Sequence, residues 1–278
     1  MTTHEDPFAV NRAHWDEVAE LHRVSYDTDS LVDGTRRLSD QVTLDEPLLS
    51  PFLPGGSPAG LTMLHLQCHI GTDTLSWARL GARVTGLDMS GESLRVAREL
   101  TASAGVEVEY VQSSIADAAD VLNGRQFDVV YTSIGVLYWL DDLTVWANLI
   151  AGVLKPGGVF YIRELHPVAN ALDFENARGE LHLAWPYFNT GPLLEVSSID
   201  YSSPVPVVNA SRYEWFHSLE DVIGSLLSAG LTIRSFHEYK TLPWQALPWM
   251  EPDGHGDFAL PESQRNLCPL AFSLVAIK

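Results

Sequence analysis

The sequence of 278 residues predicts an α/β fold with a doubly wound, mostly parallel sheet. Residues 63–90, MLHLQCHIGTDTLSWARLGARVTGLDMS, follow the order strand, turn, helix, strand. The apolar run at 61–66 is typical of a strand buried on both faces, and Gly71 lies where the chain turns into the helix. The second strand, over 83–87, ends at Asp88. Ligands of such sheets bind outside the carboxyl ends of the strands, so Asp88 is placed to accept hydrogen bonds from a ribose.

The turn after the first strand distinguishes between adenosine-containing ligands. A dinucleotide requires several glycines, so that the helix N-terminus can approach its pyrophosphate. Residues 67–73, QCHIGTD, hold one glycine and end on an acid, which disfavours a nicotinamide oxidoreductase. S-Adenosylmethionine carries no phosphate, and its site tolerates bulk and negative charge at this turn.

Periodicity and turn residues predict the remaining elements. A helix over 11–23 and a proline- and glycine-rich linker at 51–60 come before the sheet. After it we expect a helix over 93–104 capped by Ser90, a third strand over 106–111, a fourth within 127–140, a fifth within 153–167, a helix over 218–229, and final strands over 231–239 and 270–278.

Residues 61–165, with the strand pair at the C-terminus, resemble the class I S-adenosylmethionine-dependent methyltransferases. The resemblance implies a Rossmann-like sheet of seven strands whose final pair is reversed. The first motif of that family usually runs acid-x-Gly-x-Gly-x-Gly, whereas this chain has His65 in place of the acid, and Gln67 and His69 in place of the first two glycines. A pocket remodelled at the methionine end of the cofactor is therefore expected.

The resemblance implies S-adenosylmethionine as the cofactor and locates its contacts. Asp88 takes the ribose, and Gly71 is the remaining glycine of the turn. Gln67 or His69 contacts the amino or carboxylate group of the methionine moiety; alternatively, His65 and His69 only line a crowded turn. Met89 lies against the adenine, unless it belongs to the ordinary core. The other expected contacts are Cys68, Ser114, Ile115 and Ser133.

Methyl transfer is an in-line displacement that requires alignment, exclusion of water and, for a poor nucleophile, removal of a proton. Residues for this must follow the fourth and fifth strands, where Tyr138, Glu164 and His166 occur. Pro167 favours an extended conformation of His166 at the end of its strand. We predict His166 as the base, with Glu164 or Tyr138 orienting the acceptor. The alternative is a structural His166 and catalysis by proximity alone.

The chain is expected to hold an N-terminal helical cap over 1–60 and one catalytic domain over 61–278. Two insertions, 166–211 and 241–262, are rich in proline and aromatic residues. Long loops of this kind usually cover binding sites, and aromatic side chains suit a small, largely apolar acceptor. A homodimer interface is the alternative reading of these aromatic segments.

Composition excludes several classes of function. The 36 Asp and Glu residues outnumber the 17 Lys and Arg residues, which disfavours a nucleic-acid substrate. Two cysteines, the absence of a leader at MTTHEDPFAV and the absence of a long apolar run predict a cytoplasmic protein without a membrane segment. A metal hydrolase using His65, His69 and His166 is disfavoured because no carboxylate stands at a diagnostic spacing, so we expect no metal.

The sequence thus predicts a methyltransferase that moves a methyl group from S-adenosylmethionine to a small molecule. The alternative from a different class is a catalytically silent S-adenosylmethionine-binding partner or regulatory protein, because the glycines of the first motif are missing.

Overall fold

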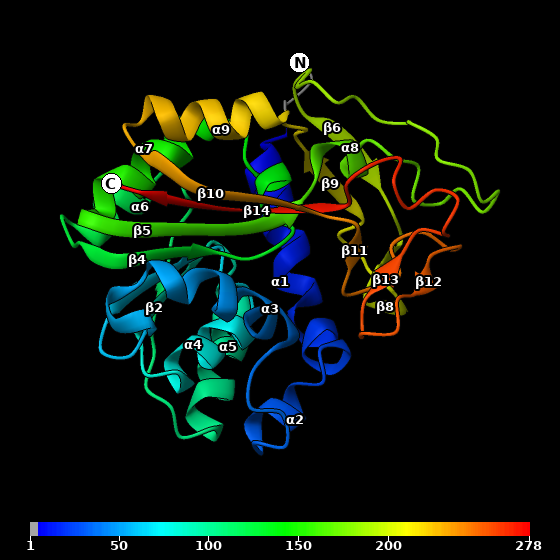
Figure 1. Ribbon diagram of the computed structural model, residues 1–278. Helices are drawn as coiled ribbons and strands as arrows, with labels where there is room; N and C mark the ends of the chain where they lie inside the picture. Colours follow the sequence, from blue (N-terminus) through cyan, green and yellow to red (C-terminus); the bar gives the residue numbers. More distant parts are fainter. Residues whose placement is uncertain (1–4) are drawn as a thin grey trace.

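A computed structural model of the chain describes residues 5–278 and has a seven-stranded sheet at its centre (Figure 1). The strand order is β10-β14-β5-β4-β1-β2-β3. Neighbouring strands among β1 to β5 run parallel, whereas β14 is antiparallel to both β5 and β10. The strands are β1 (Thr62–Leu66), β2 (Arg83–Asp88), β3 (Glu109–Gln112), β4 (Phe127–Thr132), β5 (Leu154–Leu165), β10 (Thr232–Tyr239) and β14 (Ala271–Ile277). The predicted doubly wound, mostly parallel sheet of seven strands is confirmed. Of the final strand pair only β14 is reversed, because β10 is antiparallel to β14 and therefore runs in the direction of β1 to β5.

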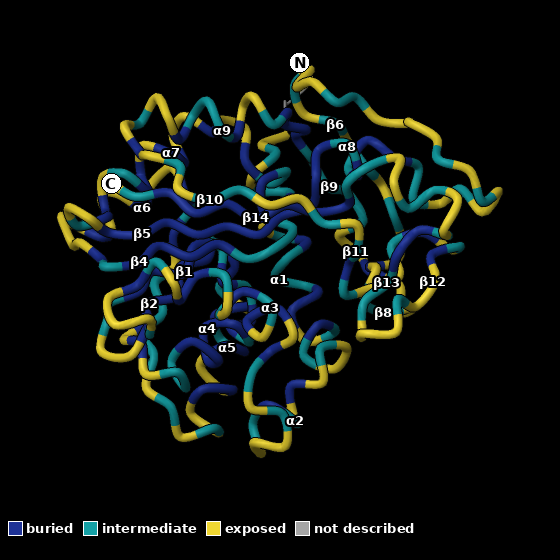
Figure 2. Tube along the Cα trace, viewed as in Figure 1, coloured by how far each residue is buried: buried dark blue, intermediate teal, exposed yellow. Residues whose placement is uncertain are grey.

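Helices cover both faces of the sheet, because alternate residues of each buried strand point to opposite sides. On one face, Leu64 and Leu66 belong to a core built with α6 (Ala118–Leu122), α7 (Leu143–Val153) and α9 (Leu219–Ser228). On the other, Met63 and Trp77 belong to a core built with α3 (Asp40–Leu49) and α4 (Thr72–Arg79). Figure 2 shows the central strands as the most continuously buried part of the chain.

The N-terminal segment is more helical than the sequence pattern predicts. It contains α1 (Pro7–Ser25), α2 (Thr28–Val32) and α3, with short 3-10 turns η1 (Ser50–Phe52) and η2 (Pro54–Gly56) in the expected linker. The prediction missed α3, which lies against the sheet and buries Asp45 beneath the hydroxyl groups of Tyr131 and Tyr161, both 2.7 Å away. The predicted cap begins at residue 1, and the segment MTTHEDPFAV was predicted to contain no leader. Residues 1–4 of both lie outside the described residues.

The two insertions gather at the carboxyl ends of the strands, where α1 runs between them and the sheet (Figure 1). The first contributes α8 (Pro167–Asn170), β7 (Ile199–Asp200), β8 (Ser203–Pro206) and β6 (Leu193–Val196), which pairs with β9 (Ser211–Glu214). The second forms a small sheet of β11 (Thr241–Leu242), β12 (Glu251–Pro252) and β13 (Phe258–Ala259). None of the helices within residues 5–278 is both long enough and apolar enough to cross a bilayer.

Candidate functional site

A cavity of about 1770 Å³ lies at the carboxyl end of the sheet, where the sequence predicts the ligand site. Its walls come from the turn after β1, the ends of β2, β3 and β4, helix α1 and both insertions. The volume exceeds the usual range for a single small ligand, roughly 300–1,000 Å³. The cavity is therefore large enough for a nucleoside-sized molecule and a second small molecule side by side.

The turn after β1 keeps a glycine-like backbone although glycine is mostly absent from it. Gln67 and His69 have left-handed φ angles of 53° and 49°, and Gly71 has a φ of 76°. Such angles are costly for residues that carry a Cβ, by roughly 1–2 kcal/mol each. At Gly71 no other residue fits, because an added Cβ would lie 2.6 Å from Tyr110 Oη. Gly71 thus shapes the turn, while Gln67, Cys68 and His69 line the cavity.

Asp88 faces this turn from the end of β2 and lines the cavity. Its carboxylate accepts hydrogen bonds from the backbone N–H groups of His69, at 2.8 Å, and Ser90, at 2.9 Å. Burial raises the pKa of Asp88 to about 6, although these backbone hydrogen bonds favour the ionised form. The acid predicted to take a ribose is thus held by the backbone at the cavity wall.

The other predicted contacts also lie around the cavity, whereas His65 is buried behind its wall. Met89, Ser114, Ile115 and Ser133 line it. Ser114 is tied into its own turn by a 2.7 Å hydrogen bond from its hydroxyl to Asp117. His65, which replaces the acid of the first motif, is buried behind the wall between Thr74 Oγ1 and Ser133 Oγ, and burial lowers its pKa to about 3. It is a neutral core histidine.

Of the three predicted catalytic residues, only Tyr138 lies in the cavity wall. Glu164 is directed away from it: the buried carboxylate accepts backbone N–H groups of Gly135, Val136 and Leu137 at 2.7–3.1 Å. It thereby fixes the loop after β4 instead of facing an acceptor.

His166 is likewise not among the described residues that line the cavity. Its backbone is extended before Pro167, as predicted, but the proline begins α8. The ring caps that helix, since Nδ1 accepts from Val168 N at 3.1 Å, and Nε2 lies 3.2 Å from Glu238. This geometry agrees with the alternative in which His166 has a structural role. Because its ring does not line the cavity, we do not consider His166 further as the base.

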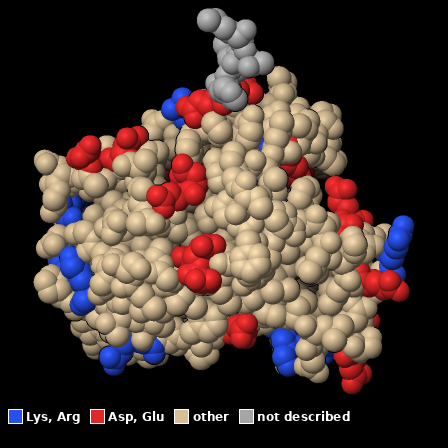
Figure 3. All heavy atoms as spheres, turned by 90° about the horizontal axis from the view of Figure 1, so that it is seen from above, with Lys and Arg blue, Asp and Glu red and all other residues tan. Residues whose placement is uncertain are grey.

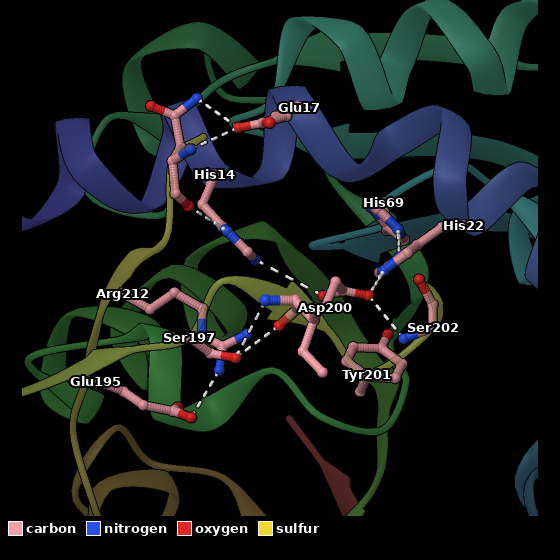
Figure 4. A network of polar contacts seen from close by, with 12 residues as sticks. His14, Glu17, His22, His69, Glu195, Ser197, Asp200, Tyr201, Ser202 and Arg212 are labelled. Carbon is pink, nitrogen blue, oxygen red and sulfur yellow. Dashed lines mark hydrogen bonds and ion pairs between the residues drawn. The ribbon is translucent and has the colours of Figure 1, made fainter. Parts of the chain in front are cut away.

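Helix α1 holds the first insertion over the cavity (Figure 4). Asn11 exchanges two hydrogen bonds with the backbone of Tyr213, at 2.7 and 2.8 Å. One turn later, His14 Nδ1 lies 2.8 Å from the carbonyl of Asn209, and Glu17 accepts from the backbone N–H groups of Val208 and Asn209. The helix and the insertion therefore form one cap.

A chain of polar side chains joins this cap to the turn after β1. Figure 4 shows His22 between His69 and Asp200. Nδ1 of His22 lies 2.6 Å from His69 Nε2, and its Nε2 lies 2.8 Å from Asp200 Oδ1. Nδ1 of His69 lies 3.0 Å from Ser93 Oγ. Asp200 was not predicted from the sequence, because its partner His22 is far away in the chain.

Charged residues that the sequence analysis also missed line the cavity from the β6–β9 hairpin: Glu195, Arg212 and Glu214. Arg212 Nη2 lies 2.8 Å from Glu195 Oε1. The sequence holds one charged residue in LLEV and two, separated by a tyrosine, in SRYE, and segments of four residues are too short for such a pattern to be distinctive.

Aromatic side chains line the cavity between the turn after β1 and the insertions. Trp15 of α1 packs edge-on against His69 and Trp139, with ring centroids 5.0 and 5.1 Å away. The hydroxyl of Tyr26 is hydrogen-bonded to that of Tyr201. Within residues 5–278 no group of three or more His, Cys, Asp or Glu residues has an arrangement that could hold a metal ion.

Comparison with known proteins agrees with this geometry. Residues 64–162 match the family described as a methyltransferase domain. The chain is 32% identical over 127 residues to the ubiquinone biosynthesis O-methyltransferase of Methylobacterium sp. (strain 4-46), an alignment that covers 46% of this chain and 50% of that protein. It is 38% identical over 117 residues to the enzyme of the same name from Xanthomonas axonopodis pv. citri (strain 306), which covers 41% and 48%. The chain thus spans about half the length of these curated relatives.

The whole fold has a counterpart among solved structures. The crystal structure of an S-adenosylmethionine dependent methyltransferase from Mesorhizobium loti superposes with a TM-score of 0.59 at 20% identity. The alignment covers 84% of this chain and 97% of that one, so the common fold includes much of the cap and the insertions.

Proposed function

We propose that this chain, which belongs to the class I S-adenosylmethionine-dependent methyltransferases, transfers a methyl group from that cofactor to a small-molecule acceptor. The single observation that carries the proposal is the turn after β1. It keeps the backbone angles of the glycine-rich motif at Gln67, His69 and Gly71, and it faces Asp88 across one cavity. The cofactor, when bound, supplies an electrophilic methyl group on a sulfonium.

The residues of the turn fit this cofactor. The side-chain carbonyl oxygen of Gln67 is buried without a hydrogen-bond donor among the described residues, while its Nε2 donates to the carbonyl of Val136. An unsatisfied acceptor beside the cavity suits the ammonium of the methionine moiety. Asp88 suits the ribose hydroxyls, and Met89 and Ile115 offer apolar contacts to the adenine.

The chain itself positions the reactants and excludes water. The cap of α1 and the first insertion covers the cavity, and Trp15, Tyr138 and Trp139 line it. Enclosure of this kind aligns a nucleophile with the methyl group and replaces water by protein groups. Tyr138 remains a candidate for orienting the acceptor, because it is the predicted catalytic residue whose side chain is in the wall.

A small acceptor is favoured over a nucleic acid. On the face shown in Figure 3, acidic side chains are scattered across the surface and basic ones lie toward its margins. Such a surface offers no continuous cationic track for a phosphate backbone. A cytoplasmic location, suggested by the two free thiols, and a homodimer through the aromatic insertions stay predictions.

Calorimetry with S-adenosylhomocysteine and NAD tests the proposal. S-Adenosylhomocysteine should bind and NAD should not, because the turn cannot cradle a pyrophosphate. Asp88→Asn should weaken S-adenosylhomocysteine binding, whereas Asp120→Asn, an exposed acid on α6, should leave it unchanged. Tighter binding of NAD than of S-adenosylhomocysteine would overturn the assignment. Turnover of any small molecule would then separate an enzyme from the silent binding partner.

A further inference from the structure

The β6–β9 hairpin presents three charged side chains on the face that lines the cavity. Glu195 stands directly opposite Arg212 in the register, and Glu214 follows two residues later on the same side of β9. The intervening residues of β6, Leu194 and Val196, are exposed on the opposite face. The hairpin thus has a charged side toward the cavity and an apolar side toward solvent.

Two carboxyl groups share this face of the hairpin with one guanidinium group. Arg212 forms an ion pair with Glu195 at 2.8 Å, and Glu214 lies on the same face of the hairpin, two residues after Arg212. Two neighbouring carboxyl groups cannot both ionise readily. Burial, followed by the charge of Glu195, raises the pKa of Glu214 to about 8, despite the opposing effect of Arg212. At neutral pH the pair therefore holds a proton that it can release.

A second, separate observation indicates a cation in the same space. Asp200, on the wall next to the hairpin, has a side chain that is 1% exposed, and its Oδ2 has no hydrogen-bond donor among the described residues. Burial raises the pKa of Asp200, but the neighbouring rings of His14 and His22 outweigh it and hold the pKa well below its usual value. His22 Nε2 is hydrogen-bonded to Oδ1 at 2.8 Å, whereas His14 Nε2 lies 3.7 Å from Oδ2, too far for a hydrogen bond. An ionised acceptor without a donor thus lines the cavity.

The surroundings of the pair suit a protonated amine. Tyr138 of η3 (Leu137–Trp139) and Tyr201 of the β7–β8 turn line the cavity near it. Phe174 and Trp244 of the two insertions line the same cavity. Aromatic faces attract ammonium groups by cation–π interactions. The cavity is also lined by the titratable groups of Arg12 and His14 on α1 and of Glu175 in the first insertion.

The hairpin is held firmly enough to position a reacting group. Glu214 lies between Tyr213, which Asn11 of α1 binds through two hydrogen bonds, and Trp215, whose N–H donates to the carbonyl of Tyr138 at 2.9 Å. The ring of Trp215 stacks on Phe8, with centroids 5.3 Å apart. Both neighbours of Glu214 are thus anchored to elements of the cavity wall.

We propose that this part of the cavity binds a protonated amine as the methyl acceptor, with the Glu195–Glu214 pair holding its ammonium group and Glu214 taking its proton. The inference rests on the proposed function, since it names the acceptor class of that same site.

The proposed step moves one proton to Glu214 and one methyl group to the nitrogen. Binding of the ammonium releases the shared proton of the pair to solvent, which leaves both carboxylates ionised. Glu214 then takes one proton from the ammonium, so the nitrogen gains a free lone pair. That lone pair forms the bond to the methyl carbon while the carbon–sulfur bond breaks, and its electrons go to sulfur as a neutral thioether. The product leaves as a methylated ammonium ion.

Binding of three matched probes to the protein loaded with S-adenosylhomocysteine tests the proposal: benzylamine, benzyl alcohol and benzoate. They share one ring and differ in charge. Benzylamine should bind at least tenfold more tightly than either of the others at pH 7. Calorimetry in two buffers of different ionisation heat should show that its binding releases about one proton, because a group with a pKa near 8 is mostly protonated at that pH.

Glu214→Gln should abolish both the preference for the amine and the proton release while S-adenosylhomocysteine still binds. Glu220→Gln, an exposed position on α9, is the matched control and should change neither. If Glu214→Gln does not fold, Glu195→Gln replaces it, because that side chain is 39% exposed, and it too should lose the preference.

Two results distinguish the inference from its premise. Equal or tighter binding of benzyl alcohol or benzoate to a protein that binds S-adenosylhomocysteine normally would overturn the amine acceptor alone. Failure of the wild-type protein to bind S-adenosylhomocysteine would overturn the proposed function itself.

Discussion

Nδ1 of His22 lies 2.6 Å from Nε2 of His69, so the first helix is hydrogen-bonded to the turn that follows the first strand of the sheet. The donors and acceptors in this series of hydrogen bonds can be assigned from the carboxylate at one end of it. A carboxylate only accepts, so His22 Nε2 donates to Asp200, and its Nδ1 then accepts from His69 Nε2. His69 Nδ1 accepts in turn from the hydroxyl of Ser93. Burial lowers the pKa of His69, which agrees with a neutral His69 ring.

Asp200→Ala should destabilise the cap. The substitution leaves the buried Nε2 of His22 and the backbone N–H of Ser202 without their acceptor. Hydrogen bonds to a buried charge contribute about 1.5–3 kcal/mol each, so the free energy of unfolding in urea should fall by about 2–4 kcal/mol. Hydrogen exchange in residues 199–215 should also accelerate. Asp120→Ala is the control. If Asp200→Ala lowers the free energy of unfolding no more than the control does, the hydrogen bonds of Asp200 do not stabilise the cap.

The affinity for S-adenosylhomocysteine should rise with pH. Asp88 has a pKa of about 6, raised by burial, and its ionised form is the better acceptor for ribose hydroxyls. Affinity should therefore increase as the pH rises through about 6 and level off above it. Asp88→Asn should bind more weakly by about 1.5–3 kcal/mol at pH 7.5. Titrations from pH 5 to 8 check both points, and a rise with pH that persists in Asp88→Asn would assign the proton to another group.

The sheet could be predicted because its signals are local. The apolar strands, the turn at Gly71 and the cap at Ser90 each lie within a few residues of the element they define. Helix α3 was missed since it contains Pro47 and its packing partners come from β4 and β5. Periodicity along the chain carries no information about such partners.

Apart from Gly71, the residues predicted to hold the cofactor line the cavity for the same reason, whereas two of the three predicted catalytic residues do not line it. Gln67, His69 and Asp88 belong to one contiguous motif. The side chain of Glu164, by contrast, is directed by three N–H groups of the loop at 135–137, which the sequence does not place. Glu214 lines the cavity because β9 pairs with β6 to form a hairpin within the long insertion. No spacing in the sequence predicts that pairing.

His166→Ala should have a small effect, contrary to the expectation from the sequence. The ring caps α8 and lies against Glu238 outside the cavity wall. Loss of an N-cap costs about 1 kcal/mol, so the midpoint of urea unfolding should shift modestly. Affinities for S-adenosylhomocysteine and benzylamine should stay within about twofold of the wild type, since the cap acts on stability alone. A tenfold loss of benzylamine affinity would return His166 to the acceptor site.

His65→Gln should make the protein less sensitive to acid. The ring of His65 is buried beside Tyr131, and burial lowers its pKa from about 6.5 to about 3. The unfolded chain therefore binds the proton first as the pH falls, so the contribution of His65 to stability is complete above pH 6.5 and declines toward pH 3. The decline is at most about 1.4 kcal/mol per pH unit. Glutamine cannot titrate, so urea unfolding at pH 7, 6, 5 and 4 should show the wild type losing about 2–3 kcal/mol more than the variant. Other buried groups, such as Asp88, titrate in both proteins and cancel in the difference. Parallel stability curves would mean that His65 is protonated in the folded state, which its position between two hydroxyl groups and an aromatic ring argues against.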